Sequence, residues 1–386
     1  MSDKLVPGNR LTLLRSGKEY FPALEAAIRE AQQEIFLETY IFEDDATGRR
    51  IARALCGAAA RGVTVHLIVD GFGSKDMPEK LSRQLLDAGV GLLVYRPQIS
   101  PWTFRRHRLR RMHRKIVVVD ARVAFVGGIN IIDDMHTPRQ VPPRYDYAVR
   151  IEGPLLRPLQ EAAERLWNRV ALIRGERRWR IDGRADVDVA PKGSQRAVLV
   201  VRDNFRHRDD IERAYLKAIE SAREEIVLAN AYFFPGIRFR RALLRAAGRG
   251  VRVVLLLQGR VEYALLHYAS RALYGTLLEA GVEIYEYHRG FLHAKVAVVD
   301  GHWATVGSSN IDPFSLTLAR EANVVVDDRD FAAELHGSLH SAMKKGAQVV
   351  AKTHWFRQPI WSRLPIWFAY ALVRFITGMI GYGGKF

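Results

Sequence analysis

The second half of this chain repeats the first, and this duplication limits the possible folds more than any other feature. Three segments recur in the same order at an offset near 190 residues: AQQEIFLETYIF with SAREEIVLANAYFF, AARGVTVHLIVDG with AGRGVRVVLLLQG, and DAGVGLLVY with EAGVEIYEY. The repeated unit, of roughly 150 residues, has the size of one domain. The 386-residue chain is therefore expected to fold as two similar domains.

Short apolar runs alternate with amphipathic stretches in each half. We predict strands and helices at 34–41, 48–60, 63–69, 78–88 and 90–95, and again at 225–231, 238–248, 251–257, 262–279 and 282–287. This alternation is typical of α/β layering with buried sheets. Apolar periodicity is lost near 175–195, so we place the first domain at 1–185 and the second at 190–350. We expect two pseudosymmetric α/β domains packed face to face.

Each half carries the same polar residues after its third predicted strand. The two sets are His113, Lys115, Asp120, Gly128 and Asn130, and His293, Lys295, Asp300, Ser308 and Asn310. The histidine and the asparagine are 17 residues apart in both. Residues two apart on a strand point to the same face, so each histidine emerges beside its lysine. The glycine that ends the following strand would let the backbone approach a phosphate.

Two such sets, brought together across a pseudo-twofold axis, would surround one pocket with two histidines, two lysines and two asparagines. This pocket would offer a nucleophile, an acid and donors for phosphate oxygens. A single His-x-Lys pair means little, but the full pattern occurs twice at matching places in the repeat. For Asp120 and Asp300 a second interpretation stays open, in which they only build the turn between two strands.

The doubled pattern HxKxxxxD followed by G[GS]xN resembles the phospholipase D superfamily. Longer stretches, among them RMHRKIVVVDARVAFVGGIN and HWATVGSSNIDPFSL, are similar to the bacterial cardiolipin synthases, most of all to the B type. The resemblance spans nearly the whole chain. It implies a phospholipase D-like fold with the active site between the domains. It also implies transfer of a phosphatidyl group from one phosphatidylglycerol to another, with release of glycerol.

The resemblance further implies a two-step reaction that uses neither a metal nor a cofactor. One histidine attacks phosphorus while the other protonates the leaving alcohol, and an acceptor alcohol then attacks the phosphohistidine. By analogy we assign His113 as the nucleophile and His293 as the acid and base, although pseudosymmetry allows the reverse. The non-bridging oxygens would be held by Lys115, Lys295, Asn130, Asn310, Gly128 and Ser308.

A nucleophilic imidazole needs an acceptor on its other nitrogen, which fixes the tautomer. The resemblance implies a carboxylate for this purpose in the strand after each motif. Asp146 in YDYAVR and Glu321 in REANVV match that position. The alternative is that both are ordinary charges at strand ends.

Other acidic residues have two possible roles each. Glu38 lies inside an apolar predicted strand, with its counterpart near Asn230, and would serve either the pocket or a structural ion pair. Asp133, Asp134 and His136 could form a metal cluster, but a solvated loop is the favoured interpretation, and we predict no metal site.

The surface and the C-terminus indicate contact with a membrane. The formal net charge of +17 attracts polyanions, which include both nucleic acid and anionic lipid. Within the segment 355–386, an apolar run of 19 residues at 364–382 has Arg374 in its middle. We expect it to lie in the membrane interface, with a spanning anchor and a core helix as alternatives. The basic, aromatic loop 100–111 would either contact anionic headgroups or remain solvated.

These features together predict a peripheral enzyme on the cytoplasmic side of the bacterial inner membrane. Its expected partners are phosphatidylglycerol and an anionic membrane surface. A phospholipase D-like nuclease is the alternative, which the basic surface suits but the apolar segment 355–386 does not need. A catalytically inactive binding module is a third possibility, against which the two intact motifs argue.

Overall fold

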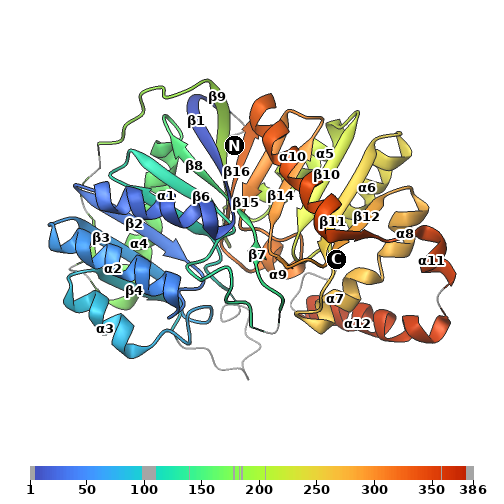
Figure 1. The fold of residues 1–386 in the computed structure, drawn as a ribbon, viewed down its shortest axis with the longest axis horizontal. Helices are drawn as coiled ribbons and strands as arrows, with labels where there is room; N and C mark the ends of the chain where they lie inside the picture. Colours follow the sequence, from blue (N-terminus) through green and yellow to red (C-terminus); the bar gives the residue numbers. More distant parts are fainter. Residues whose placement is uncertain are drawn as a thin grey trace.

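The computed structural model shows two α/β halves side by side (Figure 1). It describes residues 5–97, 110–138, 140–176, 179–181, 183, 186–204, 206–357 and 359–379. Most of the basic loop predicted at 100–111 falls outside the described residues.

The first half contains most of the elements expected from its pattern. They are β1 (Val6–Arg15), α1 (Ser16–Glu30), β2 (Glu34–Thr39), α2 (Ala46–Ala60), β3 (Thr64–Asp70), α3 (Glu79–Asp87), β4 (Gly91–Tyr95), β5 (Lys115–Val119), β6 (Val123–Gly127), β7 (Arg144–Tyr145), β8 (Tyr147–Glu152) and α4 (Leu156–Arg174).

The second half repeats this order and adds elements at its end. They are β9 (Gln195–Arg202), α5 (Asp210–Ser221), β10 (Glu225–Asn230), α6 (Ile237–Gly248), β11 (Arg252–Gln258), α7 (Ala264–Arg271), α8 (Tyr274–Glu279), β12 (Glu283–Tyr287), β13 (Phe291–Leu292), β14 (Lys295–Val299), β15 (Trp303–Gly307), α9 (Pro313–Thr317), β16 (Glu321–Asp327), α10 (Arg329–Gly346), β17 (Ala347–Val349), α11 (Lys352–Arg357) and α12 (Ile360–Met379).

The strand order confirms the two pseudosymmetric domains. Fifteen strands form one hydrogen-bonded sheet in the order β17-β12-β11-β10-β14-β15-β16-β9-β1-β8-β6-β5-β2-β3-β4. The antiparallel pair β1–β9 stands where the halves meet, and the strands on its two sides correspond in order. The halves also pack against each other, because β6 and β8 contact β15 and β16.

The predicted elements match the structure within one or two residues, apart from 262–279, which divides into α7 and α8. The sequence interpretation missed β1 and β9, the strands that join the halves. Pro7 and Gly8 interrupt the start of β1, and only part of the strand alternates. A continuous apolar core stiffens the junction, because Trp167 of α4 and Leu335 of α10 belong to the same cluster.

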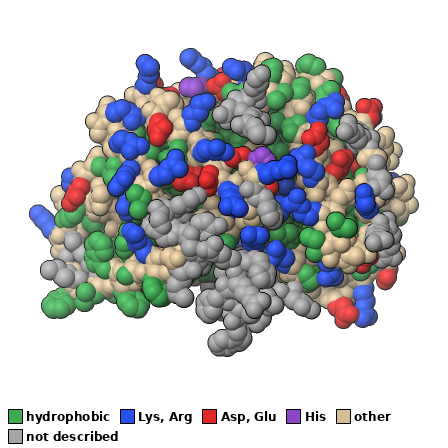
Figure 2. Space-filling model, turned by 180° about the vertical axis from the view of Figure 1, so that it is seen from behind, with side chains coloured by type: hydrophobic (Ala, Val, Ile, Leu, Met, Phe, Trp, Pro, Cys, Tyr) green, Lys and Arg blue, Asp and Glu red, His purple; other side chains and the backbone are tan. Residues whose placement is uncertain are grey.

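The C-terminal helix α12 has two different faces. Ile366, Ala369 and Val373 are buried in the core of the second half, where α12 packs on α7. On the other side, the side chains of Trp361 and Phe368 are 79% and 70% exposed. Hydrophobic side chains gather at the corner where α12 lies, at the lower left of Figure 2. The apolar run is therefore partly a core helix and partly an unpaired apolar surface.

None of the described helices is both long enough and apolar enough to cross a membrane.

Candidate active site

The segment before β5 carries His113 into contact with the second half. The His113 amide donates to the carbonyl of Arg320 at 2.9 Å, and the Arg320 amide donates to the carbonyl of Arg111 at 2.8 Å. On the other side, the Met112 amide donates to the Asp70 carboxylate at 2.8 Å. These hydrogen bonds hold the His113 backbone beside Arg320, the residue that precedes β16.

The second motif makes the equivalent contact in the opposite direction. Strand β13 pairs in parallel with β7, and the His293 amide donates to the carbonyl of Tyr145 at 2.8 Å. Gln258 takes the place of Asp70, because its side chain accepts from the Leu292 amide at 3.1 Å. Each histidine is therefore placed beside the strand that carries the carboxylate of the other half.

The two orienting carboxylates are exchanged between the halves. His113 Nδ1 lies 3.0 Å from Glu321 Oε1, and His293 Nδ1 lies 2.7 Å from Asp146 Oδ2. Both carboxylates are almost completely buried. Engaging Nδ1 in this way fixes each ring and leaves Nε2 for chemistry.

Gly128 and Ser308 serve these carboxylates, which corrects the prediction that they contact phosphate. A side chain at Gly128 would collide with the Asp146 carboxylate, since an ideal Cβ there would lie 2.4 Å from its oxygens. At the matching position in the second half, the Ser308 hydroxyl donates to Glu321 Oε2 at 2.5 Å and accepts from the Ala322 amide at 3.0 Å. Glycine makes room for one carboxylate, and serine binds the other.

Both lysines of the motifs are buried beside the histidines. The pKa of Lys115 is lowered to about 7, mainly by burial; the charge of Glu321 opposes the shift and that of Lys295 adds to it. Burial also lowers the pKa of Lys295, whose Nζ lies 3.5 Å from Asp146 Oδ2. The charges of the two lysines act on each other's surroundings across the site, which is compatible with the predicted contact to a phosphate anion.

Both imidazoles favour the neutral form. Burial is the main cause of the lowered pKa of His113, and Glu321 opposes it. The pKa of His293 falls well below its ordinary value through burial and through the charges of Lys295 and Arg144. A neutral ring with Nδ1 bound to a carboxylate is the nucleophilic form of histidine.

The two asparagines lie at the ends of β6 and β15. Asn130 Oδ1 accepts from the Ile41 amide at 3.2 Å, which leaves its NH₂ group as a donor. Asn310 is 3% exposed, and its buried Oδ1 has no partner among the described residues. An unpaired amide oxygen can only accept, so this vacancy fits a hydroxyl group or a water rather than a phosphate oxygen, and the phosphate contact of Asn310 through its NH₂ group stays a prediction.

Asp120 and Asp300 build turns, so their place in the catalytic set is a correction. Asp120 accepts hydrogen bonds from the amides of residues 32–34, and Asp300 accepts them from residues 223–225. At about 3.3 Å per residue, Asp120 lies roughly 16 Å along the strand from Lys115. In both motifs the aspartate follows the histidine by seven residues, and this spacing places its carboxylate at the opposite end of the strand.

Glu38 has the structural role that the sequence left open. Its carboxylate binds Arg114 in a buried bidentate pair, with a distance of 2.6 Å from Arg114 Nη2 to Oε1. Sheet register pairs Glu38 with Ile116 in the first half, and Ala229 with Val296 in the second. The counterpart of Glu38 is therefore Ala229, the neighbour of Asn230.

The acidic residues after the first motif bind protein donors. Asp133 accepts from the Thr47 hydroxyl at 2.9 Å, and Asp134 accepts from the Gly17 amide at 2.6 Å. Burial raises the pKa of Asp134 to about 6. In the described part of the chain, no group of three or more histidine, cysteine or acidic side chains could hold a metal ion.

Sequence reasoning missed Tyr40 and a group of arginines. The Tyr40 ring lies edge-on to the His113 ring at 4.8 Å between centroids, and Lys115 Nζ lies 5.4 Å from the centre of the Tyr40 ring. The position of Tyr40 just after the first strand of the repeat, where the second half has Ala231, was the available signal. Because Tyr40 and Ala231 occupy equivalent positions in the two halves, the difference between them makes the two sides of the site unlike each other.

A large basic cavity adjoins the first motif. It has a volume of about 1260 Å³, and its described lining includes nine arginines against one carboxylate, that of Asp203. Arg114 and Arg320, the sequence neighbours of His113 and Glu321, line it, while Leu166, Val170 and Ile173 supply an apolar wall. Lys and Arg side chains gather across the middle of this face in Figure 2.

Comparisons with known proteins agree with this geometry. The sequence profile of the family described as "Cardiolipin synthase, PLD-like domain" matches residues 24–167 and 215–343. Cardiolipin synthase B of Escherichia coli (strain K12) is 42% identical over 376 residues, which cover 97% of this chain and 90% of that protein. Cardiolipin synthase A of Pseudomonas fluorescens is 31% identical over 88% of this chain and 70% of its own.

A solved structure shares the fold. Phosphatidylserine synthase from Haemophilus influenzae Rd KW20 superposes with a TM-score of 0.69 over 96% of this chain and 94% of its own, at 13% sequence identity. The fold, the doubled motif and the full-length relatives lead to one conclusion. The chain belongs to the cardiolipin synthase family of phospholipase D-like proteins.

Proposed function

We propose that this protein is a cardiolipin synthase, which transfers a phosphatidyl group from one phosphatidylglycerol to another and releases glycerol. The crossed pairs His113–Glu321 and His293–Asp146 support this reaction best. They supply two imidazoles, each with Nε2 available, beside two buried lysines. This is the equipment for a double displacement at phosphorus.

In the first step His113 Nε2 attacks phosphorus, and the bond from phosphorus to the glycerol oxygen breaks. His293 gives its Nε2 proton to that oxygen. In the second step a hydroxyl of the acceptor lipid attacks phosphorus, the bond to His113 breaks, and His293 takes the hydroxyl proton. The bound phosphate anion and Asp146 both favour the protonated form of His293, which offsets the effect of burial.

Lys115 and Lys295 would stabilise the charge that grows on the non-bridging oxygens. The amides of Asn130 and Asn310 would add neutral donors. The arginine-lined cavity, whose lining includes Arg114 of the first motif, combines positive charge with an apolar wall, which suits an anionic phospholipid.

Purified enzyme given labelled phosphatidylglycerol should form cardiolipin and glycerol in equal amounts. The same enzyme should leave labelled single-stranded DNA intact. Cleavage of DNA without cardiolipin formation would favour the nuclease alternative and overturn the proposal.

Chelation tests the metal-free mechanism. Turnover in EDTA should stay within about twofold of the untreated rate, because the proposed nucleophile and acid are imidazoles and the proposed oxyanion donors are lysines. Initial rates of cardiolipin formation measure this. Loss of activity in EDTA, restored by zinc, would contradict it and give Asp133, Asp134 and His136 a new importance.

The exposed face of α12 is proposed to hold the enzyme on the membrane. Lipid substrates stay in the bilayer because each buried CH₂ contributes about 0.8 kcal/mol. Trp361, Phe368 and Phe375 present apolar rings that are 64% to 79% exposed. Insertion of such rings is not screened by salt, whereas attraction by the net charge of +17 is.

Replacing Trp361, Phe368 and Phe375 with serine should leave vesicle binding intact in low salt and abolish it in high salt. Sedimentation with phosphatidylglycerol vesicles measures the bound fraction. Val349→Ser, which changes an equally exposed residue on β17, is the matched control. Deleting the segment would be a poorer test, because Ile366 and Trp355 belong to the core. Unchanged binding of the triple variant in high salt would show that α12 is no anchor.

A further inference from the structure

The two walls of the active site differ at one pair of equivalent positions. Phe42 and Phe233 form equivalent bridges to Ile131 and Ile311, so Tyr40 corresponds to Ala231, two residues earlier in each half. Tyr40 covers one side of His113 with its ring. Ala231 leaves that space open on the side of His293, where its amide donates to the Ala294 carbonyl at 2.9 Å.

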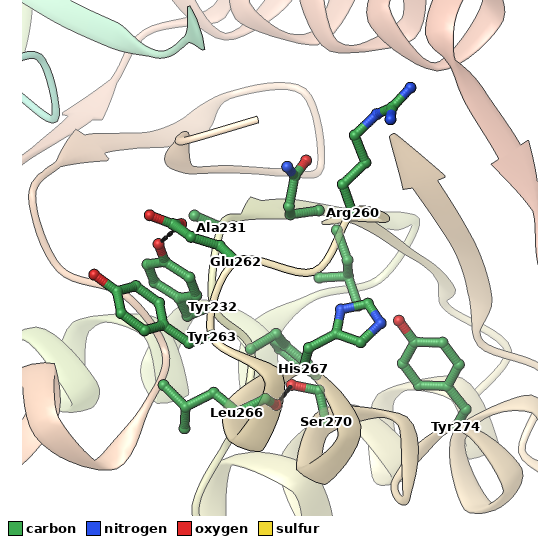
Figure 3. A pocket seen from close by; sticks show the side chains of 12 residues that line it. Ala231, Tyr232, Arg260, Glu262, Tyr263, Leu266, His267, Ser270 and Tyr274 are labelled. Carbon is green, nitrogen blue, oxygen red and sulfur yellow. Dashed lines mark hydrogen bonds between the residues drawn. The ribbon is translucent and has the colours of Figure 1, made fainter. Parts of the chain in front are cut away.

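A small polar pocket occupies the space beside Ala231 (Figure 3). Its lining includes Tyr232, Glu262 and Arg260. The Tyr232 hydroxyl donates to Glu262 Oε2, and Figure 3 shows the Tyr263 hydroxyl near this pair, with Ser270 and His267 further along the wall. The Arg260 side chain extends away from this pair and its Nε donates to the His288 carbonyl at 2.9 Å, so the carboxylate and the phenols are the groups that can bind the hydroxyl groups of one small molecule.

This pocket adjoins the catalytic centre of the second half. Gln258 lines it and also accepts from the amide of Leu292, the neighbour of His293. Burial raises the pKa of Glu262, while the hydrogen bond from Tyr232 and the charges of Arg144 and Lys295 oppose the shift. The pocket therefore lies next to the segment that carries His293.

The first half has no equivalent of this carboxylate. Glu262 lies four residues after Gln258, and Ser74 lies four residues after Asp70, the structural equivalent of Gln258. Ser74 donates to the Tyr40 carbonyl at 3.0 Å and accepts from the Phe42 amide at 2.9 Å. Tyr40 and Ser74 therefore fill the space on the side of His113, while Ala231 and Glu262 leave a pocket on the side of His293.

We propose that the pocket beside Ala231 binds the polyol of the reaction, with Glu262 and Tyr232 as the residues that select it. Its ligand is a small uncharged alcohol with adjacent hydroxyl groups: the glycerol headgroup of the acceptor lipid or the glycerol that leaves. This inference rests on the proposed transferase function. In this arrangement the donor phosphate binds on the side of His113, and the alcohol binds on the side of His293.

The chemistry of the pocket favours a polyol over its competitors. The positive charges of Arg144 and Lys295, which act on Glu262, offset the attraction of that carboxylate for the ammonium group of an amino alcohol. Water fits but can satisfy only part of the polar wall, and a buried donor or acceptor left unpaired costs binding energy. A site built to bind hydroxyl groups can discriminate strongly against a ligand that lacks them.

The partition of the intermediate tests the proposal. A short-chain phosphatidyl p-nitrophenol donor carries a leaving group that needs no polyol pocket, so release of nitrophenol reports the first step. In the presence of glycerol, the ratio of phosphatidylglycerol to phosphatidic acid then reports the choice between alcohol and water. This ratio is independent of the amount of folded enzyme in a preparation.

Glu262→Gln, Tyr232→Phe and the pocket-filling Ala231→Tyr should each shift this ratio toward water by about tenfold or more. Nitrophenol release by folded enzyme should stay within a few fold. Glu279→Gln, which changes an exposed carboxylate on α8, is the control and should leave the ratio unchanged. An unchanged ratio in all three variants would overturn the proposal that this pocket binds the polyol, without contradicting the transferase function. A wild-type enzyme that forms only phosphatidic acid, even in concentrated glycerol, would overturn both this inference and the proposed function.

Discussion

His113→Ala is expected to lower turnover by about 10³-fold or more, because it removes the atom that bonds to phosphorus. In wild-type enzyme or in His293→Ala, a short-chain labelled donor should leave an acid-labile, base-stable adduct on His113. The adduct should accumulate in His293→Ala, since the acceptor hydroxyl then has no base. Rapid quenching in base followed by mass spectrometry of the peptides locates the adduct.

His302→Ala is the control, because this histidine is half exposed and its Nδ1 binds Asp327 at 3.0 Å, in a pair that resembles the catalytic ones. Its rate should match that of the wild type. An adduct on His293 would reverse the assignment of the two roles. Absence of any adduct in both wild type and His293→Ala would argue against a covalent route.

The exchanged carboxylates predict a crossed pattern of defects. Glu321→Gln should slow formation of the adduct, since Glu321 orients the nucleophile His113. Asp146→Asn should let the adduct accumulate, since Asp146 orients His293 in the other half. Each change should lower kcat by about 10²- to 10⁴-fold with little effect on KM, because loss of tautomer control acts on the chemical step.

Both carboxylates are buried, so the folding of each variant needs a separate check by thermal unfolding. Accumulation of the adduct in Glu321→Gln but not in Asp146→Asn would show that each carboxylate serves the histidine of its own half. Near-normal rates in both would remove the two residues from the mechanism.

The sequence was enough to predict the two domains and the residues that carry His113, Lys115 and their equivalents. The motif occurs twice at matching places in the repeat, and the apolar residues after each lysine identify the strand that carries it. The other buried strands followed from apolar periodicity. The exchange of Asp146 and Glu321 could not be predicted. It depends on parallel pairing between segments about 150 to 200 residues apart, which no local pattern specifies.

Position along a strand misled the interpretation in two places. Asp120 belongs to the motif by spacing, yet it lies just beyond the far end of the five-residue strand that begins at Lys115. Gly128 looked like a phosphate contact, yet the space above it holds a carboxylate from the neighbouring strand. In both cases the sequence identified the position, and only the three-dimensional neighbours revealed its role.

Because the carboxylates are exchanged, each histidine–carboxylate pair joins the two halves across the same interface. The distances of 2.7 Å and 3.0 Å are within the range of a good hydrogen bond. A relative shift of the halves by about 1 Å would lengthen both beyond that range. Either imidazole alone would then be of little use, so the halves must dock correctly before any chemistry begins. The shared core of α4 and α10 and the pairing of β1 with β9 hold the halves in the arrangement that both pairs need.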